Sequence, residues 1–271
     1  MPERPVIGFL TDFGLDGAAA ICRGVMLSIA RDAQIVDISH VVRKFAISDG
    51  AYLLRAALPW LPVGTHVAVV DPGVGTSRRP VGILTARGDA LIGPDNGLLL
   101  PAAERLGGIR EARVLDNRDW MLPTTSATFH GRDIFAPIAA HLAVGGAFAA
   151  IGSPIDPGDL VRLGLPGAAA RPGRLDTGVV YVDSFGNLRL DGTAADLASS
   201  IPELHPGMAL VLELPTGDLR ATFARTFGEV AAGDLLVYED SAGDLALGES
   251  TGNAARRLGL QVGTRIGLRR A

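Results

Sequence analysis

The sequence predicts an α/β protein: an N-terminal α/β domain with a largely parallel sheet, followed by a smaller β-rich domain for which we favour a β-barrel. Three observations predict this fold class. Strand-like and helix-like segments alternate through the first half. Prolines then stand among glycines and alanines between Gly152 and Gly173, which is typical of a linker. Nearly every regular segment beyond that stretch is strand-like. We expect the domains to span residues 1–165 and 166–271.

The expected elements of the first domain alternate along the chain. Asp49–Leu58 has an acidic residue in its first turn, which favours a helix, and Pro59 ends it. Val67–Val70 is rich in β-branched residues, which favours a strand. The full set comprises strands at Val6–Phe9, Ile35–Ile38, Val67–Val70, Val81–Ala86 and Ala90–Ile92, and helices at Ala18–Ala30, Asp49–Leu58, Leu98–Leu106 and Ile134–Val144.

The second domain shows little helical periodicity apart from Asn253–Leu258. Its expected strands are Gly178–Val182, Ala209–Leu214, Leu235–Tyr238 and Thr264–Leu268. Short strands separated by turn residues are typical of sandwiches and barrels.

Composition excludes several classes of protein. The chain has 271 residues, of which 48% are hydrophobic and 20% charged, as in a globular protein. The net charge of −4 and the absence of a Lys/Arg run argue against a nucleic-acid partner. Cys22 is the single cysteine, which leaves no intrachain disulfide or thiolate zinc site. The first residues lack a signal-peptide core and no apolar run reaches membrane-spanning length, so we expect a cytoplasmic protein with no membrane partner.

Polar turns follow three expected strands of the first domain. Thr11-Asp12 follows the first, Asp71 follows Val67–Val70, and Gly93–Gly97 follows Ala90–Ile92. Each of these segments, taken alone, is most simply interpreted as a turn. Because ligands of open α/β sheets bind at the carboxyl ends of the strands, the three together favour a site there.

His130 stands at the entrance of an apolar helix, among polar neighbours, and histidine exchanges protons near neutral pH. Other familiar site motifs are missing. Gly73-Val74-Gly75 resembles the start of a dinucleotide fingerprint, but Arg78 occupies the third glycine position. The chain has no Gly-Lys-Ser/Thr loop and no paired-histidine motif, so we expect neither a metal nor a cofactor.

A polar turn also ends the first strand of the second domain. Asp183, Phe185 and Asn187 offer a carboxylate, an aromatic face and an amide within five residues. Such groups can hold a flat heterocycle and a cationic amine, although a plain β-turn is the simpler interpretation of this segment alone. Phe223 is a comparable aromatic at a strand end.

Five segments in order make the chain resemble the S-adenosyl-L-methionine hydroxide adenosyltransferase family, relatives of the fluorinase and chlorinase enzymes. The five segments are Leu10-Thr11-Asp12-Phe13-Gly14, Val70-Asp71-Pro72-Gly73-Val74-Gly75, Gly93-Pro94-Asp95-Asn96-Gly97-Leu98-Leu99, Thr128-Phe129-His130-Gly131-Arg132-Asp133 and Asp183-Ser184-Phe185-Gly186-Asn187. The resemblance covers nearly the whole chain. It implies an N-terminal α/β domain, a C-terminal β-barrel, and a homotrimer whose active sites lie between subunits.

The resemblance also implies an activity, the hydrolysis of S-adenosyl-L-methionine to adenosine and L-methionine by water-derived hydroxide. Asp71, Arg78 and His130 match the catalytic residues of the hydroxide-using members. The halogen-using relatives carry tyrosines in place of the Asp and the His.

Substrate-binding roles follow from the same resemblance. Asp12 and Phe45 match ribose-contacting positions; Phe185, Phe223 and Asn187 match adenine-contacting positions; Asp16, Asp183 and Ser241 match methionine-contacting positions; and Ala254 aligns loosely with a further binding position. Ala242 is a departure, because the halogenases have there an arginine that clamps the methionine carboxylate.

These residue types suit the reaction. The sulfonium is already a strong electrophile with a neutral leaving group, so catalysis is mainly a matter of orienting the nucleophile. Water is a weak nucleophile, with a pKa of about 15.7. The Arg78 cation would favour hydroxide, a neutral His130 would accept the proton, and Asp71 would hold Arg78.

Three other functions remain open on the sequence. One is a halogenase, against which the intact Asp71 and His130 argue. Another is a non-catalytic trimer that binds adenosine or S-adenosylmethionine, although a binding protein has no need of the catalytic residues. The third is a metal-dependent phosphoesterase built on Asp12, Asp71, Asp95, Asn96 and His130, which the few histidines disfavour.

Overall fold

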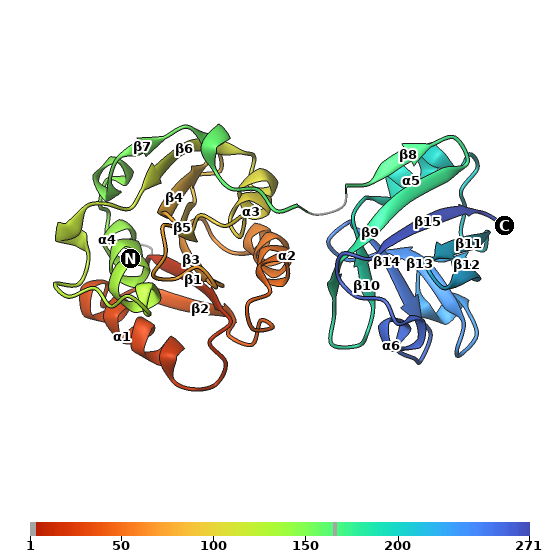
Figure 1. Ribbon diagram of the computed structural model, residues 1–271, viewed down its shortest axis with the longest axis horizontal. Helices are drawn as coiled ribbons and strands as arrows, with labels where there is room; N and C mark the ends of the chain where they lie inside the picture. The colour runs from red at the N-terminus through yellow and green to blue at the C-terminus, as the bar shows by residue number, and fades with distance from the viewer. Residues whose placement is uncertain (1–3, 165–166) are drawn as a thin grey trace. The chain divides into compact units, whose positions relative to one another are not determined.

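The computed structural model describes residues 4–164 and 167–271. The chain forms two compact units, Met1–Leu163 and Gly164–Ala271. Figure 1 shows the first as helices around a sheet and the second as a barrel of strands. The α/β class, the largely parallel first sheet and the C-terminal barrel are thereby confirmed.

The N-terminal unit is built on a seven-stranded sheet with the order β2-β1-β3-β5-β4-β6-β7. Strands β2, β1, β3 and β5 pair in parallel, whereas β4 runs antiparallel to both β5 and β6. The strands are β1 (Val6–Thr11), β2 (Gln34–Ser39), β3 (Thr65–Val69), β4 (Pro80–Thr85), β5 (Ala90–Pro94), β6 (Ile109–Val114) and β7 (Pro154–Ile155). Strand β6 and the edge strand β7 were not predicted from the sequence.

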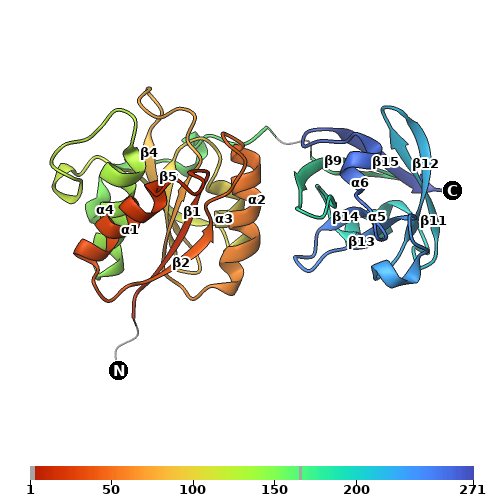
Figure 2. The ribbon, with the colours of Figure 1, turned by 90° about the horizontal axis from the view of Figure 1, so that it is seen from below.

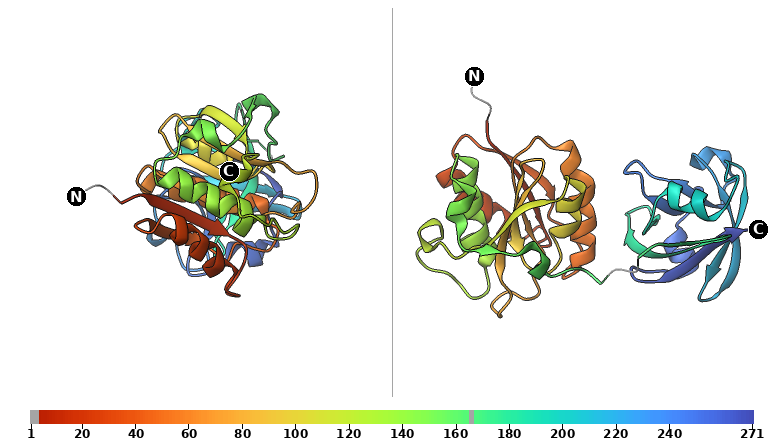
Figure 3. Two further views of the ribbon diagram at one scale, coloured as in Figure 1. Left: turned by 90° about the vertical axis from the view of Figure 1, so that its left-hand side faces the viewer. Right: turned by 90° about the horizontal axis from the view of Figure 1, so that it is seen from above.

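Helices cover both faces of this sheet, as Figures 2 and 3 show. Helices α1 and α4 pack on one face, and α2 and α3 pack on the other. The α-helices are α1 (Ala18–Ile29), α2 (Ile47–Ala57), α3 (Leu100–Arg105) and α4 (Ala136–Ala143), and the short helical turns are η1 (Leu58–Trp60), η2 (Arg118–Trp120), η3 (Gly131–Phe135, π-helical), η4 (Phe148–Ile151) and η5 (Pro157–Asp159).

The sheet's central strands are mostly apolar because both of their faces are covered, although Thr65 and His66 of β3 are also buried. Ile7 and Phe9 of β1 lie in the core beneath α1 and α4, while Leu10 lies in the core beneath α2 and α3. Side chains alternate between the faces of a strand, so one short segment contributes to both cores. This packing fixes where β1 and β3 end and therefore where the polar residues that follow them lie.

The C-terminal unit is a barrel. Its strand order is β10-β14-β13-β12-β11-β15-β9-β8, and the additional pairing of β10 with β9 closes seven strands into a ring, with β8 attached to β9. The strands are β8 (Ala169–Arg171), β9 (Arg174–Val182), β10 (Leu188–Leu190), β11 (Ala209–Leu214), β12 (Gly217–Phe223), β13 (Leu235–Glu239), β14 (Leu245–Glu249) and β15 (Arg265–Arg270). Helical segments α5 (Ala194–Ser200), η6 (Phe227–Glu229) and α6 (Ala254–Leu258) join them.

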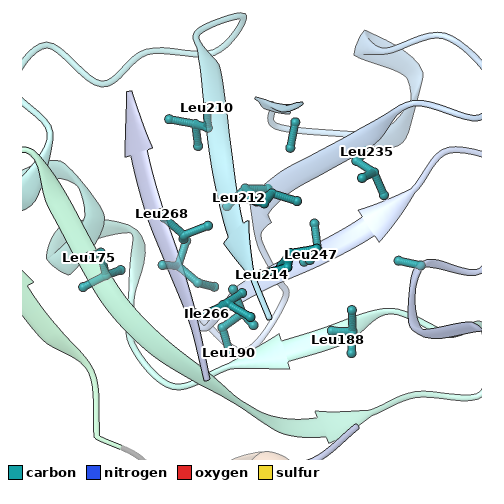
Figure 4. Packing of buried hydrophobic residues seen from close by; sticks show 14 of the residues in the cluster. Leu175, Leu188, Leu190, Leu210, Leu212, Leu214, Leu235, Leu247, Ile266 and Leu268 are labelled. Carbon is teal, nitrogen blue, oxygen red and sulfur yellow. The ribbon is translucent and has the colours of Figure 1, made fainter. Parts of the chain in front are cut away.

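Leucines fill the barrel. Leu210, Leu212 and Leu214 alternate along β11 and are buried, while the residues between them are more exposed. Figure 4 shows these side chains converging with those of β10, β14 and β15 in one core. The side chains on the outer faces and in the turns are therefore the ones available to a ligand.

In the described ranges of both units, no helix is long and apolar enough to cross a membrane.

Candidate active site

A cavity of about 560 Å³ opens in the N-terminal unit where β1 and β3 end. We call it the N-domain pocket. Two of the three expected polar turns contribute to it, through Asp12 and Asp71, and His130 joins them at the start of η3. Its lining residues are Asp12, Phe13, Asp16, Ala18, Lys44, Phe45, Val69, Asp71, Val74, Thr128, Phe129, His130 and Gly131.

Asp71, Arg78 and His130 form one hydrogen-bonded cluster. Arg78 binds the Asp71 carboxylate with two nitrogens, Nε donating to Oδ1 at 3.1 Å and Nη2 donating to Oδ2. The same Nη2 lies 3.1 Å from Nδ1 of His130. The side chains of Arg78 and Asp71 are only 7% and 4% exposed, so this two-point ion pair is shielded from water.

The contact with Arg78 fixes the tautomer of His130. A guanidinium can only donate, so Nδ1 accepts and the proton of the neutral ring sits on Nε2. Burial lowers the pKa of His130 below its ordinary value, and the positive charge of Arg78 lowers it further. The ring is therefore neutral at neutral pH. In this arrangement it presents Nε2–H as a donor, and Nδ1 must release Arg78 before it can take a proton.

The turn that carries Asp71 packs against the loop that carries His130. Gly75 has a φ of 78°, and a Cβ placed on it would lie 2.5 Å from the carbonyl oxygen of Ala127. Only glycine fits both the backbone conformation and this close approach. The Arg78 guanidinium also lies over the ring of Phe135, 5.5 Å from its centroid.

The third polar turn, Gly93–Gly97, forms hydrogen bonds with segments next to the pocket. Asn96 Nδ2 donates to the carbonyl of Val70 at 2.9 Å, next to Asp71. Asp95 accepts hydrogen bonds from Arg79 and from the backbone N–H of Val161. Neither side chain lines the N-domain pocket, and no group of three or more His, Cys, Asp or Glu residues in the described parts of the chain could hold a metal ion.

Asp12 and Phe45, expected to bind the ribose, and Asp16, expected near the methionine, line this pocket. Asp12 is buried, and its Oδ2 accepts a hydrogen bond of 2.9 Å from the backbone N–H of Phe45. Phe45 has a φ of 65°, and its side chain is exposed. Asp16 and Lys44 are exposed beside them. Lys44 was not among the residues predicted from the sequence, and the only sequence signal is its place directly before Phe45.

The barrel carries two further cavities that share Phe185, Asn187 and Phe227. The first, of about 500 Å³, is lined by Phe185, Asn187, Phe227, Gly228, Glu249, Ser250, Thr251 and Gly252. The second, of about 410 Å³, is lined by Asp183, Phe185, Asn187, Arg189, Arg225, Thr226, Phe227, Tyr238, Glu239, Asp240 and Ser241. We call them the aromatic pocket and the charged pocket.

Asp183 organises the turn between β9 and β10. Its Oδ1 accepts hydrogen bonds of 2.9 Å from the backbone N–H groups of Phe185 and Asn187, and its Oδ2 accepts one from Asn187 Nδ2 at 3.0 Å. These bonds hold Phe185 outward, where 76% of it is exposed. An exposed aromatic ring on a rigid turn is well placed to stack on a flat ligand.

Two expected binding residues of the barrel do not line these pockets. Phe223 is half-buried and packs against the barrel core, and Ala254 is fully buried at the start of α6. Phe227 lines both pockets instead. The sequence does not reveal which of two aromatics four residues apart faces a pocket. Arg189 was also missed, although the alternation of Asn187 and Arg189 with the buried Leu188 and Leu190 places both on the outer face.

The fold and the site together define a class of protein: an α/β domain with a hydrogen-bonded Asp–Arg–His cluster, joined to a barrel with an exposed aromatic residue on a turn. The family model of the SAM hydroxide adenosyltransferase N-terminal domain matches residues 7–152, and that of its C-terminal domain matches residues 177–267. The chain belongs to the SAM hydroxide adenosyltransferase family.

Similar proteins match this chain over nearly its full length. The (R)-S-adenosyl-L-methionine hydrolase of Salinispora tropica is 44% identical, with 98% of each chain covered. That of Thermus thermophilus is 37% identical, with 98% of this chain and 99% of the relative covered, while the fluorinase of Actinopolyspora mzabensis is 30% identical over 99% and 98%. Among solved structures, an uncharacterised conserved protein from Thermotoga maritima has a TM-score of 0.90 at 33% identity, with 97% of this chain and 100% of that chain covered.

Proposed function

We propose that this protein hydrolyses S-adenosyl-L-methionine to adenosine and L-methionine. The observation that carries the proposal is the shielded Asp71–Arg78–His130 cluster, two of whose members line the N-domain pocket together with Asp12. The names of the relatives support it, because the hydrolases are more similar to this chain than the fluorinases are.

The chemistry needs a nucleophile in line with the C5′–S bond. The oxygen of a water-derived hydroxide forms a bond to C5′ as the C5′–S bond breaks, and the electron pair of that bond stays on sulfur. Methionine therefore leaves as a neutral thioether and needs no acid. The protein's contribution is to hold the ribose, for which we propose Asp12 and Phe45, and to hold the oxygen at the cluster.

Arg78 is the proposed anchor for that oxygen. Within the described residues, its Nη1 is buried and has no hydrogen-bond partner. A buried guanidinium N–H is rarely left unsatisfied, so an oxygen ligand at this nitrogen is the simplest completion of the cluster. The positive charge would lower the pKa of a bound water, while Asp71 keeps Arg78 in place.

His130 has two proposed contributions. With Nδ1 held by Arg78, its Nε2–H can donate to the nucleophile and orient it. If Nδ1 exchanges Arg78 for the water, the same neutral ring can accept the water's proton. Both contributions require the unprotonated imidazole, which the lowered pKa favours.

The direct test is to incubate the purified protein with S-adenosylmethionine and to follow adenosine and methionine by chromatography, with and without a chelator. We expect equal adenosine formation in both, because we propose no metal or cofactor. A 5′-halogenated product in the presence of chloride or fluoride would favour the halogenase instead, and tight binding without turnover would favour the binding protein.

We further propose a homotrimer in which the N-domain pocket of one subunit completes its site with the barrel of its neighbour. Asp12 and Phe45, proposed for ribose binding, line a pocket of the first unit, whereas Phe185 and Asn187, proposed for adenine binding, line pockets of the second unit. On this proposal, each pocket would supply part of the contacts to one substrate molecule. We also propose a cytoplasmic location, with which a single buried free cysteine is compatible.

A further inference from the structure

Arg189 connects the two turns of the barrel that carry proposed substrate-binding residues. Its Nη2 donates to Asp183 Oδ2 at 3.3 Å, in the turn of Phe185 and Asn187. Its Nε lies 3.3 Å from Asp240 Oδ2, in the turn of Ser241. Its Nη1 donates to the hydroxyl of Tyr238 at 3.1 Å. Three contacts from three nitrogens fix the plane of the guanidinium.

This guanidinium lines the charged pocket together with Asp183 and Ser241. The Arg189 side chain is 17% exposed, so it is shielded enough for its charge to act strongly and still accessible to a ligand. Asp240 also shapes the neighbouring turn, because its Oδ1 accepts hydrogen bonds from the backbone N–H groups of Ala242 and Asp244.

The charged pocket is otherwise unfavourable to a carboxylate. Asp183, Glu239 and Asp240 line it, and like charges repel an anionic ligand. Position 242, directly after Ser241, is alanine and offers no positive charge. The other arginine of the pocket, Arg225, is largely exposed and forms hydrogen bonds and an ion pair with Glu229.

We propose that Arg189 binds the α-carboxylate of the substrate's amino-acid end. The inference rests on the proposed function. The zwitterion would set its ammonium against the acidic groups of the pocket and its carboxylate against Arg189, with Ser241 beside it. Arginine suits this task because its planar fork matches a carboxylate and keeps its charge when shielded.

The test compares two substrates that differ only in this carboxylate: S-adenosylmethionine and its decarboxylated form, S-adenosyl-3-methylthiopropylamine. Both have the same sulfonium and the same reacting carbon. We expect the wild-type chain to prefer S-adenosylmethionine. In Arg189→Met, KM for S-adenosylmethionine should rise about 10- to 100-fold, as for loss of a charge-assisted hydrogen bond, with little change in kcat. KM for the decarboxylated compound should change much less.

Two variants serve as controls. Arg189→Lys keeps the charge and should retain part of the preference. Arg225→Met removes the other arginine of the charged pocket and should keep the preference. Dissociation constants of both compounds, measured by calorimetry in an Arg78→Ala background, repeat the comparison without turnover.

The outcomes separate this inference from the proposed function. An equal rise in KM for the two compounds in Arg189→Met would overturn the inference. Arg189 would then serve only to hold the two turns together. Lys44→Met could instead lose the preference for S-adenosylmethionine while Arg189→Met keeps it. That result would place the carboxylate in the N-domain pocket and would also overturn the inference. A wild-type chain that forms no adenosine would contradict the hydrolase proposal, while the calorimetric comparison would still decide the role of Arg189.

Discussion

Arg78 contacts both of its partners through one nitrogen, Nη2, so the three proposed catalytic side chains act as a unit. Arg78→Ala should lower kcat by about 10³-fold or more while KM changes little, since the proposed adenine and ribose contacts come from other residues. The Arg78→Ala, His130→Ala double variant should be little worse than either single variant. Steady-state kinetics provide the check, and a kcat near wild type in Arg78→Ala would make the cluster structural.

The lowered pKa of His130 predicts the acid limb of the pH profile. Its folded-state pKa lies below the ordinary value of about 6.5, so the neutral, active ring persists through that pH and is lost only under more acidic conditions. kcat/KM should therefore fall on the acid side with a midpoint below pH 6.5. A limb centred at or above pH 6.5 would contradict this. His130→Ala should recover partly at high pH if the ring accepts the water's proton.

At the residue scale, the sequence predicted more of the N-domain pocket than of the barrel pockets. Asp12, Asp71 and His130 stand at strand ends or a helix start, where chain order alone indicates a site. Arg189 and Phe227 come from outer faces and turns of the barrel, where polar and aromatic residues are common. Which of them face a pocket depends on strand register and turn geometry, which the sequence does not specify.

At the scale of elements, the Asp71 turn and the η3 entrance must stay in contact for the cluster to form. Gly75→Ala would place a methyl group against the carbonyl of Ala127 and force a residue with a side chain to adopt a φ of 78°. The left-handed backbone alone should cost about 1–2 kcal/mol of unfolding free energy. The clash should displace the turn and lower kcat as well.

Gly145→Ala is the matched control for this change. Gly145 has a φ of 96°, but no atom of the described chain lies within 4 Å of the added carbon. Both variants should lower Tm, whereas only Gly75→Ala should reduce kcat. Equal kcat values for the two variants would argue that the turn contact does not position the cluster.

The strands of the sheet's centre were predictable because they are buried on both faces and appear as short apolar runs. Several of the strands that were missed, although not β10 and β14, have exposed positions. β12, for example, contains Asp218, Leu219 and Arg220, all exposed.

Helix α3 begins at Leu100 rather than Leu98, with Pro101 in its first turn, a position that proline favours.

At the scale of the whole molecule, each unit offers part of the proposed site, and a trimer is the proposed way of completing it. Co-expression of Arg78→Ala with a barrel variant, Phe185→Ala with Asn187→Ala, tests the sharing directly. Random assembly should restore activity at about a quarter of the sites, where an intact N-domain pocket meets an intact barrel of a neighbour. Activity no greater than the sum of the separate variants, or a fully active monomer by light scattering, would contradict the shared site.

Turnover of S-adenosylmethionine in oxygen-18 water tests the central claim most directly, because it follows the atom that Arg78 and His130 are proposed to hold. The account predicts adenosine with one oxygen-18 at its 5′-hydroxyl, together with unlabelled methionine, as measured by mass spectrometry. Unlabelled adenosine, or 5′-methylthioadenosine as the main product, would contradict it.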